Sequence, residues 1–228
     1  GGAFLNPSAR QQFQRVAPNA KILSYYGAAE IGFIAYSITG DDARLTPFDG
    51  LELQVRTEDG TQAAEGELGT LYVRVPSQAD RYLDTTGGRS ITGPDGWSTV
   101  EDQARLGEGK LILEGRAGDI VNTGGHKVSL VQIERALAAV PGCEHSCVVG
   151  TPHQTLGEVL TAVIEQPPSG EPPVPPKKAI LDALRRQLPP QYIPHRFAVT
   201  DELPRTVGGK VRRVAVQHEV LSGRVTRI

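Results

Sequence analysis

The chain has 228 residues, 39% of them apolar and 22% charged, which is an ordinary globular composition. Its 24 basic and 26 acidic residues leave a formal net charge of −2, which argues against nucleic acid or a membrane surface as the main partner. No stretch reaches the roughly 20 apolar residues that cross a bilayer, and the first residues lack the pattern of a signal peptide. With only two cysteines, we expect a cytoplasmic protein. The absence of methionine, even at position 1, suggests part of a longer product.

The first half of the chain predicts one helix followed by strands. Residues 8–16 have the apolar spacing of a helix, and residues 21–25 form a short apolar run that stops at Gly27, as a strand ending in a loop does. From residue 45 to 113, short alternating runs such as LELQVRT and GTLYVRV are separated by turn clusters. This texture predicts a small antiparallel sheet or open barrel.

From residue 131 onward, helical and strand patterns alternate. VQIERALAAV and AILDALRRQL predict amphipathic helices, whereas SCVVGT, LTAVIEQ and RFAVTDEL predict strands. The Pro-rich segment 167–176 is expected to be an extended surface connection. The predicted fold class is α+β, with a domain boundary near residues 116–119.

Two short patterns suggest chemistry that their spacing does not support. Gly209-Lys210 lacks the upstream Gly and the following Ser or Thr of a phosphate-binding loop. Cys143, His145 and Cys147 alternate, but in a strand the outer two side chains lie about 13 Å apart, too far for one zinc ion. We therefore expect neither site.

Four segments, by contrast, have an order and spacing that point to one family. They are YYGAAE from Tyr25, GWSTVEDQARL from Gly96, GRAGDIVNTGGHKVSLVQIE from Gly115, and LPRTVGGKVRR from Leu203. Together they resemble the later motifs of the superfamily of acyl-CoA synthetases, non-ribosomal-peptide adenylation domains and luciferases. The resemblance implies that residues 1–115 end a large AMP-binding domain with a small antiparallel β-barrel. Residues 116–119 would then be a hinge, and residues 120–228 a small mobile α+β domain.

The resemblance implies a site for ATP and Mg²⁺ in the first part of the chain. An aromatic ring at a strand end can present its face to an adenine, and a nearby carboxylate can meet a phosphate-bound Mg²⁺. Tyr26 and Glu30 match the family residues with these roles, and Asp102 matches the carboxylate that accepts both ribose hydroxyls. The other matching nucleotide positions are Gly2, Ala3, Gly27 and Arg116. Taken singly, these residues have ordinary explanations, such as a core Tyr, a loop Glu and a surface ion pair.

The second part of the chain matches the family's moving elements. Gly118 and Asp119 match the hinge, and Gly125 with His126 match the tunnel through which the pantetheine thiol arrives. Lys210 matches the lysine that bridges the substrate carboxylate and the α-phosphate. An ordinary turn at the glycines and a solvated loop lysine are the alternative explanations.

A further group of basic residues follows Lys210 and is expected to be solvated surface, with a contact to coenzyme A as a minor alternative. They are Arg212, Arg213, Arg224 and Arg227.

Several positions depart from the family pattern. The family usually has Thr at Ala29, whose missing hydroxyl removes one hydrogen bond of about 1 kcal/mol. It commonly has Thr-Gly-Asp where this chain has Val100-Glu101-Asp102, and Asp or Lys where this chain has Gly118. Glycine has the broadest accessible backbone space, so a hinge rotation remains feasible.

The implied reaction forms an acyl adenylate from ATP and a carboxylic acid, and then an acyl thioester with coenzyme A. Loading of a carrier-protein phosphopantetheine and a noncatalytic binding role are the alternatives. The family's phosphate loop has no counterpart here, so the chain alone is expected to be inactive without the preceding half of the enzyme. Phe33 and Ile34 either line the acyl pocket or pack in the core.

Overall fold

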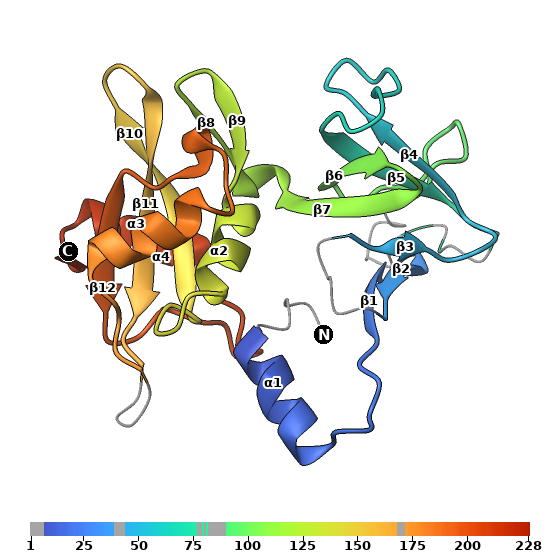
Figure 1. Cartoon of the computed structure of the whole chain (residues 1–228). Coiled ribbons are helices and arrows are strands. Elements are labelled where there is room, and N and C mark those ends of the chain that lie inside the picture. Colours follow the sequence, from blue (N-terminus) through green and yellow to red (C-terminus); the bar gives the residue numbers. More distant parts are fainter. Residues whose placement is uncertain (1–6, 39–43, 77–78, 80, 82–89, 168–171) are drawn as a thin grey trace. The chain divides into compact units, whose positions relative to one another are not determined.

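The computed structural model describes residues 7–38, 44–76, 79, 81, 90–167 and 172–228 (Figure 1). The backbone divides into two compact units, one of residues 19–117 and the other of residues 118–228 together with the first 18 residues. Gly2 and Ala3 lie outside the described residues, so their role beside an adenine stays a prediction. Among the described helices, none combines the length and apolar character needed to span a membrane.

The unit of residues 19–117 contains two antiparallel sheets. The first has the order β1-β2-β3, formed by Ser24–Ala28, Gly32–Ser37 and Thr46–Pro47. The second has the order β4-β5-β6-β7, formed by Glu52–Arg56, Gly69–Arg74, Asp102–Gly107 and Lys110–Arg116. The predicted antiparallel pairing is confirmed. The second sheet runs in an open order through the described residues, so the predicted barrel is not confirmed.

The strand predicted at residues 21–25 is placed too early. Ser24 pairs with Ser37, and because β2 ends at that residue, the segment before Ser24 has no partner to extend the ladder. Between the two sheets, Ile34, Val55, Leu71 and Leu111 form part of one buried apolar cluster. Ile34 is thus a core residue.

Gly27 lies where β1 slips by one residue against β2, at a β-bulge. A Cβ atom at Gly27 would stand 2.4 Å from the carbonyl oxygen of Gly32, and the neighbouring backbone would have to move. We therefore expect Gly27→Ala to lower the free energy of unfolding of this unit by about 1–3 kcal/mol. Denaturation followed by the fluorescence of Trp97, the single tryptophan, measures it.

Gly107→Ala is the matched control for this substitution. Its Cβ would meet the Cγ of Glu65 at an ordinary 3.6 Å, so we expect a change below about 1 kcal/mol. Equal losses from both substitutions would show that the approach to Gly32 is not what requires glycine.

The second unit is a six-stranded sheet with helices on both faces. Its strands are β8 (Ile120–Thr123), β9 (His126–Ser129), β10 (Ser146–His153), β11 (Gly157–Glu165), β12 (Arg196–Thr200) and β13 (Thr226–Arg227). Its helices are α1 (Pro7–Val16), α2 (Leu130–Ala138), α3 (Lys177–Arg185) and α4 (Arg213–Leu221), with short 3₁₀ turns at Ala117–Asp119 and Pro190–Tyr192. The helices and strands predicted from residue 131 onward are confirmed apart from shifts of a few residues at their ends, and the mixed α and β class is confirmed.

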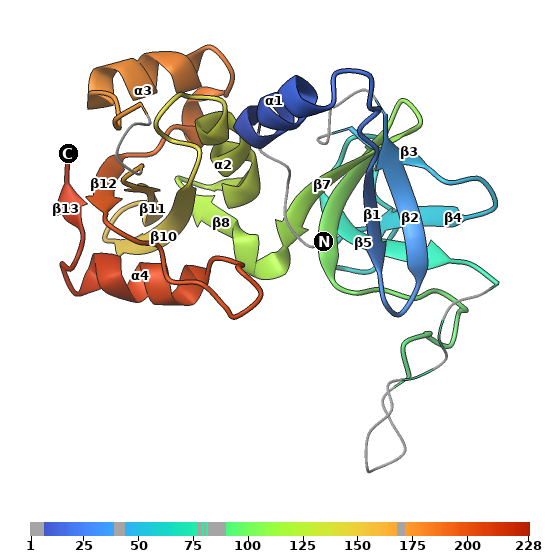
Figure 2. The same ribbon diagram turned by 90° about the horizontal axis from the view of Figure 1, so that it is seen from below.

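Strand β11 is the centre of this sheet. It pairs antiparallel with β10 and parallel with β12. Figure 2 shows α2 and α3 on one face of these strands and α4 on the other. Helices on both faces explain why burial is continuous along β11 instead of alternating.

Helix α4 was not predicted, and the assignment of Arg213 to solvated surface is wrong. Val216 is completely buried, whereas Val214 on the same helix is 80% exposed. Because Val214 and Leu221 face solvent although they are apolar, the sequence of this helix lacks a clear helical period. Only contact with the sheet identifies the buried face.

Candidate functional site

Three residues with predicted roles at the nucleotide meet in the unit of residues 19–117. Asp102, the first residue of β6, pairs with Arg116, the last residue of β7. The hydroxyl of Tyr26, on β1, donates a hydrogen bond of 2.5 Å to Oδ2 of Asp102. Nε of Arg116 lies 3.7 Å from Oδ1 of the same carboxylate. The fold thus brings together residues that are 76 and 14 positions apart in the sequence.

The electrostatics of this group keep the Tyr26 hydroxyl protonated. Burial, and then the charge and hydrogen bond of Asp102, raise the pKa of Tyr26 far above its ordinary value, while Arg116 opposes the shift. A protonated phenol is a permanent donor, so it fixes the orientation of the Asp102 carboxylate. The Arg116 side chain is 78% exposed and lies on the solvent side of the group.

Glu30 lies in the turn between β1 and β2, four residues beyond Tyr26. It is half-buried, and its carbonyl oxygen accepts a hydrogen bond of 2.8 Å from the N–H of Ala79. The neighbouring Ala29 is exposed. A carboxylate is an oxygen ligand of the kind that Mg²⁺ binds, usually together with phosphate oxygens and water. The donor chemistry of Glu30 therefore fits the predicted role.

Phe33, the other candidate for a substrate wall, is 62% exposed. Its ring centroid lies 4.8 Å from that of Tyr25 in an edge-on arrangement and 6.1 Å from that of Phe48. These contacts hold an exposed aromatic surface near the start of β2, in contrast to the buried Ile34.

The predicted hinge coincides with the division of the chain into its two units, which falls between Ala117 and Gly118. Residues Ala117–Asp119 form a single 3₁₀ turn. A Cβ atom on Gly118 would have no atom within 4 Å, so no close contact in this conformation requires glycine. The hinge function stays a prediction.

The glycines expected at the thiol tunnel form a tight hairpin turn. Thr123 pairs with His126, and the two residues between them, Gly124 and Gly125, have φ angles of 56° and 82°. A two-residue hairpin of this type requires left-handed conformations at both positions, which is sufficient reason for the two glycines. The side chain of His126 is exposed beside the turn.

Lys210 lies on a small loop whose ends are joined by a bridge between Arg205 and Val211. The N–H of Thr206 donates to the carbonyl oxygen of Lys210 at 2.8 Å, and the N–H of Lys210 donates to Oγ1 of Thr206 at 3.2 Å. The ammonium group is exposed and has no hydrogen-bond or ion-pair partner among the described residues. The backbone is ordered by these bonds while the charge remains available.

Glu165 anchors the start of the Lys210 loop. Its Oε2 accepts hydrogen bonds from the Arg205 guanidinium at 2.6 Å and from the N–H of Leu203 at 2.8 Å. Partial burial would raise the pKa of Glu165, but these two bonds outweigh it and hold the pKa below its ordinary value of 4.5.

This shift predicts how stability depends on pH. A carboxylate with a lowered pKa in the folded state stabilises the fold above the pKa of the unfolded chain, and this contribution is lost as pH falls through the folded value. We expect the difference in free energy of unfolding between the wild type and Glu165→Gln to be largest near pH 7 and to shrink below about pH 4. Denaturation of both proteins near pH 7 and below about pH 4 measures this difference. The substitution Glu202→Gln, at an exposed residue, is the control. A difference that does not change with pH would contradict the prediction.

Arg213 anchors the other end of the loop, and sequence reasoning missed it. Its Nε donates to Oδ1 of Asp119 at 2.7 Å, and its terminal nitrogens donate to both oxygens of Glu134 and, at 2.6 Å, to the carbonyl oxygen of Val148. Burial would lower the pKa of Arg213, but Glu134 and the other acidic groups raise it further above its ordinary value. The Lys210 loop is thus tied through α4 to Asp119 of the predicted hinge.

The two cysteines do not converge on one point. Cys143 belongs to the buried cluster under α2 and α3, whereas Cys147 belongs to the cluster under α4, on the opposite face of the sheet. Burial raises the pKa of each thiol to about 12. Both therefore act as core residues, and His145 between them is exposed.

Comparison with known proteins is consistent over almost the whole chain. Residues 132–210 match the family described as "AMP-binding enzyme C-terminal domain". The chain is 29% identical over 222 residues to the uncharacterized acyl–CoA ligase YhfT of Bacillus subtilis, a match that covers 95% of this chain and 44% of the ligase. It is 31% identical over 230 residues to the mitochondrial malonate–CoA ligase ACSF3 of Mus musculus, covering 87% of this chain and 38% of that protein.

The chain belongs to the superfamily of acyl-adenylate-forming enzymes.

The fold agrees with this membership. The crystal structure of apo MatB from Rhodopseudomonas palustris superimposes with a TM-score of 0.78 at 27% sequence identity, over 96% of this chain and 44% of that one. The chain therefore spans about two fifths of the length of these relatives.

Glu101 departs from the family pattern at a position whose backbone conformation favours glycine. This residue stands where the family commonly has glycine, and its φ angle is 65°, in the left-handed region. A side chain there costs roughly 1–2 kcal/mol relative to glycine, less the greater entropy that glycine has in the unfolded chain. We expect Glu101→Gly to raise the free energy of unfolding by up to about 1 kcal/mol, measured by Trp97 fluorescence.

Glu101→Ala separates the backbone effect from the loss of the carboxylate, because alanine keeps the strain of the left-handed conformation. We expect no gain from alanine. A stabilisation by alanine equal to that by glycine would assign the effect to charge and not to backbone strain.

Proposed function

We propose that the protein to which this chain belongs activates a carboxylic acid with ATP and then transfers the acyl group to the thiol of coenzyme A. In the first step, a carboxylate oxygen attacks the α-phosphorus of ATP, and the bond to pyrophosphate breaks. In the second step, the thiolate sulfur attacks the acyl carbon, and the bond to AMP breaks. The relatives named above as CoA ligases support this proposal.

The observation that carries the proposal is the arrangement of Lys210. Its ammonium is exposed and has no partner within the described ranges of the chain, while both ends of its loop are fixed by ion pairs, through Arg205 to Glu165 and through Arg213 to Glu134. A flexible cation on an ordered backbone can approach the charge that develops on the carboxylate and the α-phosphate. Lys210 is therefore our candidate for the residue that accelerates adenylate formation.

The group of Tyr26, Asp102 and Arg116 would hold the nucleoside. Asp102 is oriented by the tyrosine hydroxyl at 2.5 Å and keeps acceptor capacity for ribose hydroxyls, since a carboxylate accepts several hydrogen bonds. Arg116, largely exposed beside it, supplies a positive charge at the same point. Glu30 would hold Mg²⁺, which when bound neutralises charge on the phosphates.

The second step would use the other elements of the small unit. Rotation about Gly118 and Asp119 would withdraw Lys210 and present the hairpin of Gly125 and His126 to the adenylate. The hairpin turn has no side chains at its tip, which leaves room for a pantetheine arm. Because Arg213 links Asp119 to the Lys210 loop, the two would move together.

The test is pyrophosphate release by the protein in the longest form that its gene encodes, with ATP, Mg²⁺ and a panel of carboxylic acids that includes malonate, aromatic acids and fatty acids. Each active acid is then offered coenzyme A or a phosphopantetheine-loaded carrier protein. Release that requires the acid, followed by acyl-CoA formation, supports the proposal. If pyrophosphate release depends on the acid but the acyl group is transferred only to the carrier protein, the acceptor is the carrier protein and not coenzyme A. If no acid causes release, the proposed adenylation is wrong.

A further inference from the structure

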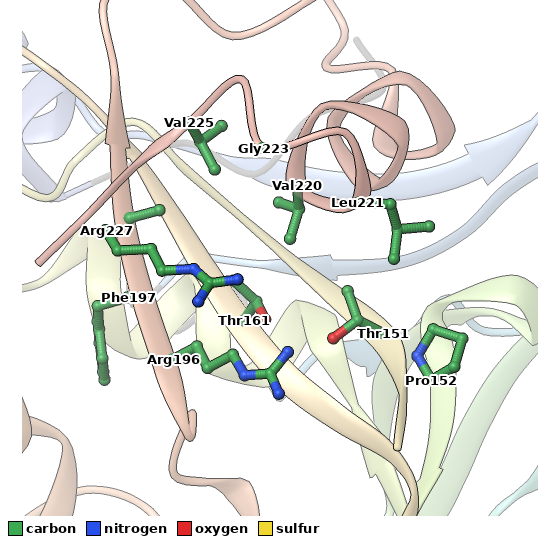
Figure 3. Close-up of a pocket in the computed structure, with 11 residues that line it drawn as sticks. Thr151, Pro152, Thr161, Arg196, Phe197, Val220, Leu221, Gly223, Val225 and Arg227 are labelled. Carbon is green, nitrogen blue, oxygen red and sulfur yellow. The ribbon is translucent and has the colours of Figure 1, made fainter. Parts of the chain in front are cut away.

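A pocket opens where α4 ends and leaves part of the sheet uncovered. Thr161 of β11 is paired with Arg196 of β12, and Arg227 of β13 is paired with Ala198 two residues further along. Because side chains alternate along a strand, all three residues point to the α4 face. Helix α4 ends at Leu221, so in the described part of the chain it does not extend over these three residues. Figure 3 shows both guanidinium groups near Thr161.

The pocket has a volume of about 130 Å³, which is ample for a small anion with its water. Its walls are apolar residues around the end of α4, including Val220, Leu221 and Val225. Its floor is formed by Thr151 and Thr161, whose side chains are almost completely buried.

The hydroxyl of Thr161 is the unusual group in this floor. The neighbouring Thr151 hydroxyl donates to the carbonyl oxygen of Val159 at 3.3 Å, but Oγ1 of Thr161 is buried and has no hydrogen-bond partner among the described residues. A buried hydroxyl without a partner costs roughly 1–3 kcal/mol, which a ligand that accepts its hydrogen bond would recover.

The two arginines at the mouth of the pocket have no acidic residue beside them in the pocket lining, over the described residues. The pocket lining holds Arg196 and Arg227 but, over the described residues, no Asp or Glu. Neither arginine makes an ion pair within the described part of the chain. Two adjacent guanidinium groups repel each other unless an anion lies between them.

The end of α4 is closed by its own backbone hydrogen bonds. The backbone N–H groups of Ser222, Gly223 and Arg224 donate to carbonyl oxygens in the last turn of α4, at 2.9, 3.3 and 2.9 Å.

We propose that this pocket binds a phosphate group, either as free phosphate or as the head of a small phosphomonoester. Arg196 and Arg227 bind its oxygens with charge-assisted hydrogen bonds, and the Thr161 hydroxyl donates to another oxygen. Guanidinium groups match tetrahedral oxyanions in geometry as well as in charge.

This site is separate from the residues of the proposed reaction. Lys210 lies on the loop before the first residue of α4, whereas the pocket lies at the other end of this helix, around Val220 and Leu221. The proposal therefore does not depend on the adenylation chemistry, and its test needs no activity.

The test is titration of the 228-residue chain with inorganic phosphate at constant ionic strength, measured by calorimetry and by shifts of the Thr161 amide resonance. We expect saturable binding at one site and a loss of affinity of about ten-fold or more in Arg196→Gln and in Arg227→Gln. Thr161→Val is expected to weaken binding a few-fold while leaving the fold at least as stable.

Arg186→Gln is the matched control, because it removes the same charge from an exposed arginine at the end of α3. Unchanged affinity in this variant is expected. An equal loss in Arg186→Gln, or the absence of saturation in the wild type, would overturn the proposal, and unchanged binding in Thr161→Val would remove Thr161 from the site.

A parallel titration with phosphoserine distinguishes the two sources of the phosphate group. Binding similar to that of phosphate indicates a phosphomonoester, and no binding indicates free phosphate.

Discussion

Lys210→Ala is expected to lower the rate of adenylate formation by about 100- to 1,000-fold, the effect of removing one preorganised electrostatic group from a reacting centre. The reason is local: the ammonium is exposed and contacts no charged or hydrogen-bonding partner in the part of the chain that the structure describes, whereas the loop that carries it is held by bonds to Thr206. Because the side chain makes no described contact within the fold, stability should not change. Carboxylate-dependent pyrophosphate release and a denaturation curve measure the two effects.

The control for this prediction is Lys178→Ala, which removes an exposed lysine from α3 in the same unit. Its activity should equal that of the wild type. If Lys210→Ala retained wild-type pyrophosphate release, the assignment of Lys210 would be wrong, whatever happened to the second step. If it instead lost stability, a structural role would replace the catalytic one.

Arg213→Ala is expected to lower the free energy of unfolding by about 3 kcal/mol, because it removes the guanidinium that pairs with two partly buried carboxylates. The side chains of Arg213, Asp119 and Glu134 are only 23%, 24% and 21% exposed. The substitution also removes the donor that serves the carbonyl oxygen of Val148. Denaturation followed by circular dichroism measures the loss, and faster amide exchange in β10 would locate it.

Arg212→Ala provides the comparison, since this neighbouring arginine is exposed and its substitution should change stability by less than about 0.5 kcal/mol. The double variant Arg213→Ala with Glu134→Gln should lose less free energy of unfolding than the two single variants added together. Once Glu134 is neutral, the loss of Arg213 no longer leaves a charge at that position without its cation. Additive effects would show that Arg213 and Glu134 do not interact in solution.

Much of the second unit could be predicted from periodicity alone. The helix beginning near residue 130 has apolar residues at helical spacing, and Ser129 caps it by accepting a hydrogen bond from the N–H of Gln132 at 3.2 Å. Strand β11 could be recognised because its run is mostly apolar and rich in β-branched residues. Helix α4 could not, because only its contact with the sheet determines which of its valines are buried.

In the candidate site, too, local sequence indicated some features and long-range contacts were needed for others. The types and spacing of Tyr26, Glu30, Asp102 and Lys210 indicated adenylate chemistry through four ordered motifs, since such short patterns depend on local sequence. The hydrogen bond between Tyr26 and Asp102 joins residues 76 positions apart, and no local signal predicts it. Arg213 was assigned to the surface because a basic residue in a basic segment is usually solvated.

Resemblance of four ordered motifs identified the family and implied the candidate chemical roles, and hydrophobic periodicity predicted the mixed α and β class, because both signals lie in short stretches of sequence. The three-dimensional fold was needed to show that Arg213 connects the Lys210 loop to Asp119, and that Arg196, Arg227 and Thr161 line one pocket. The register of β11, β12 and β13 and the length of α4 produce these groupings. Such long-range packing is set by the burial of the whole unit, which no short stretch of sequence contains.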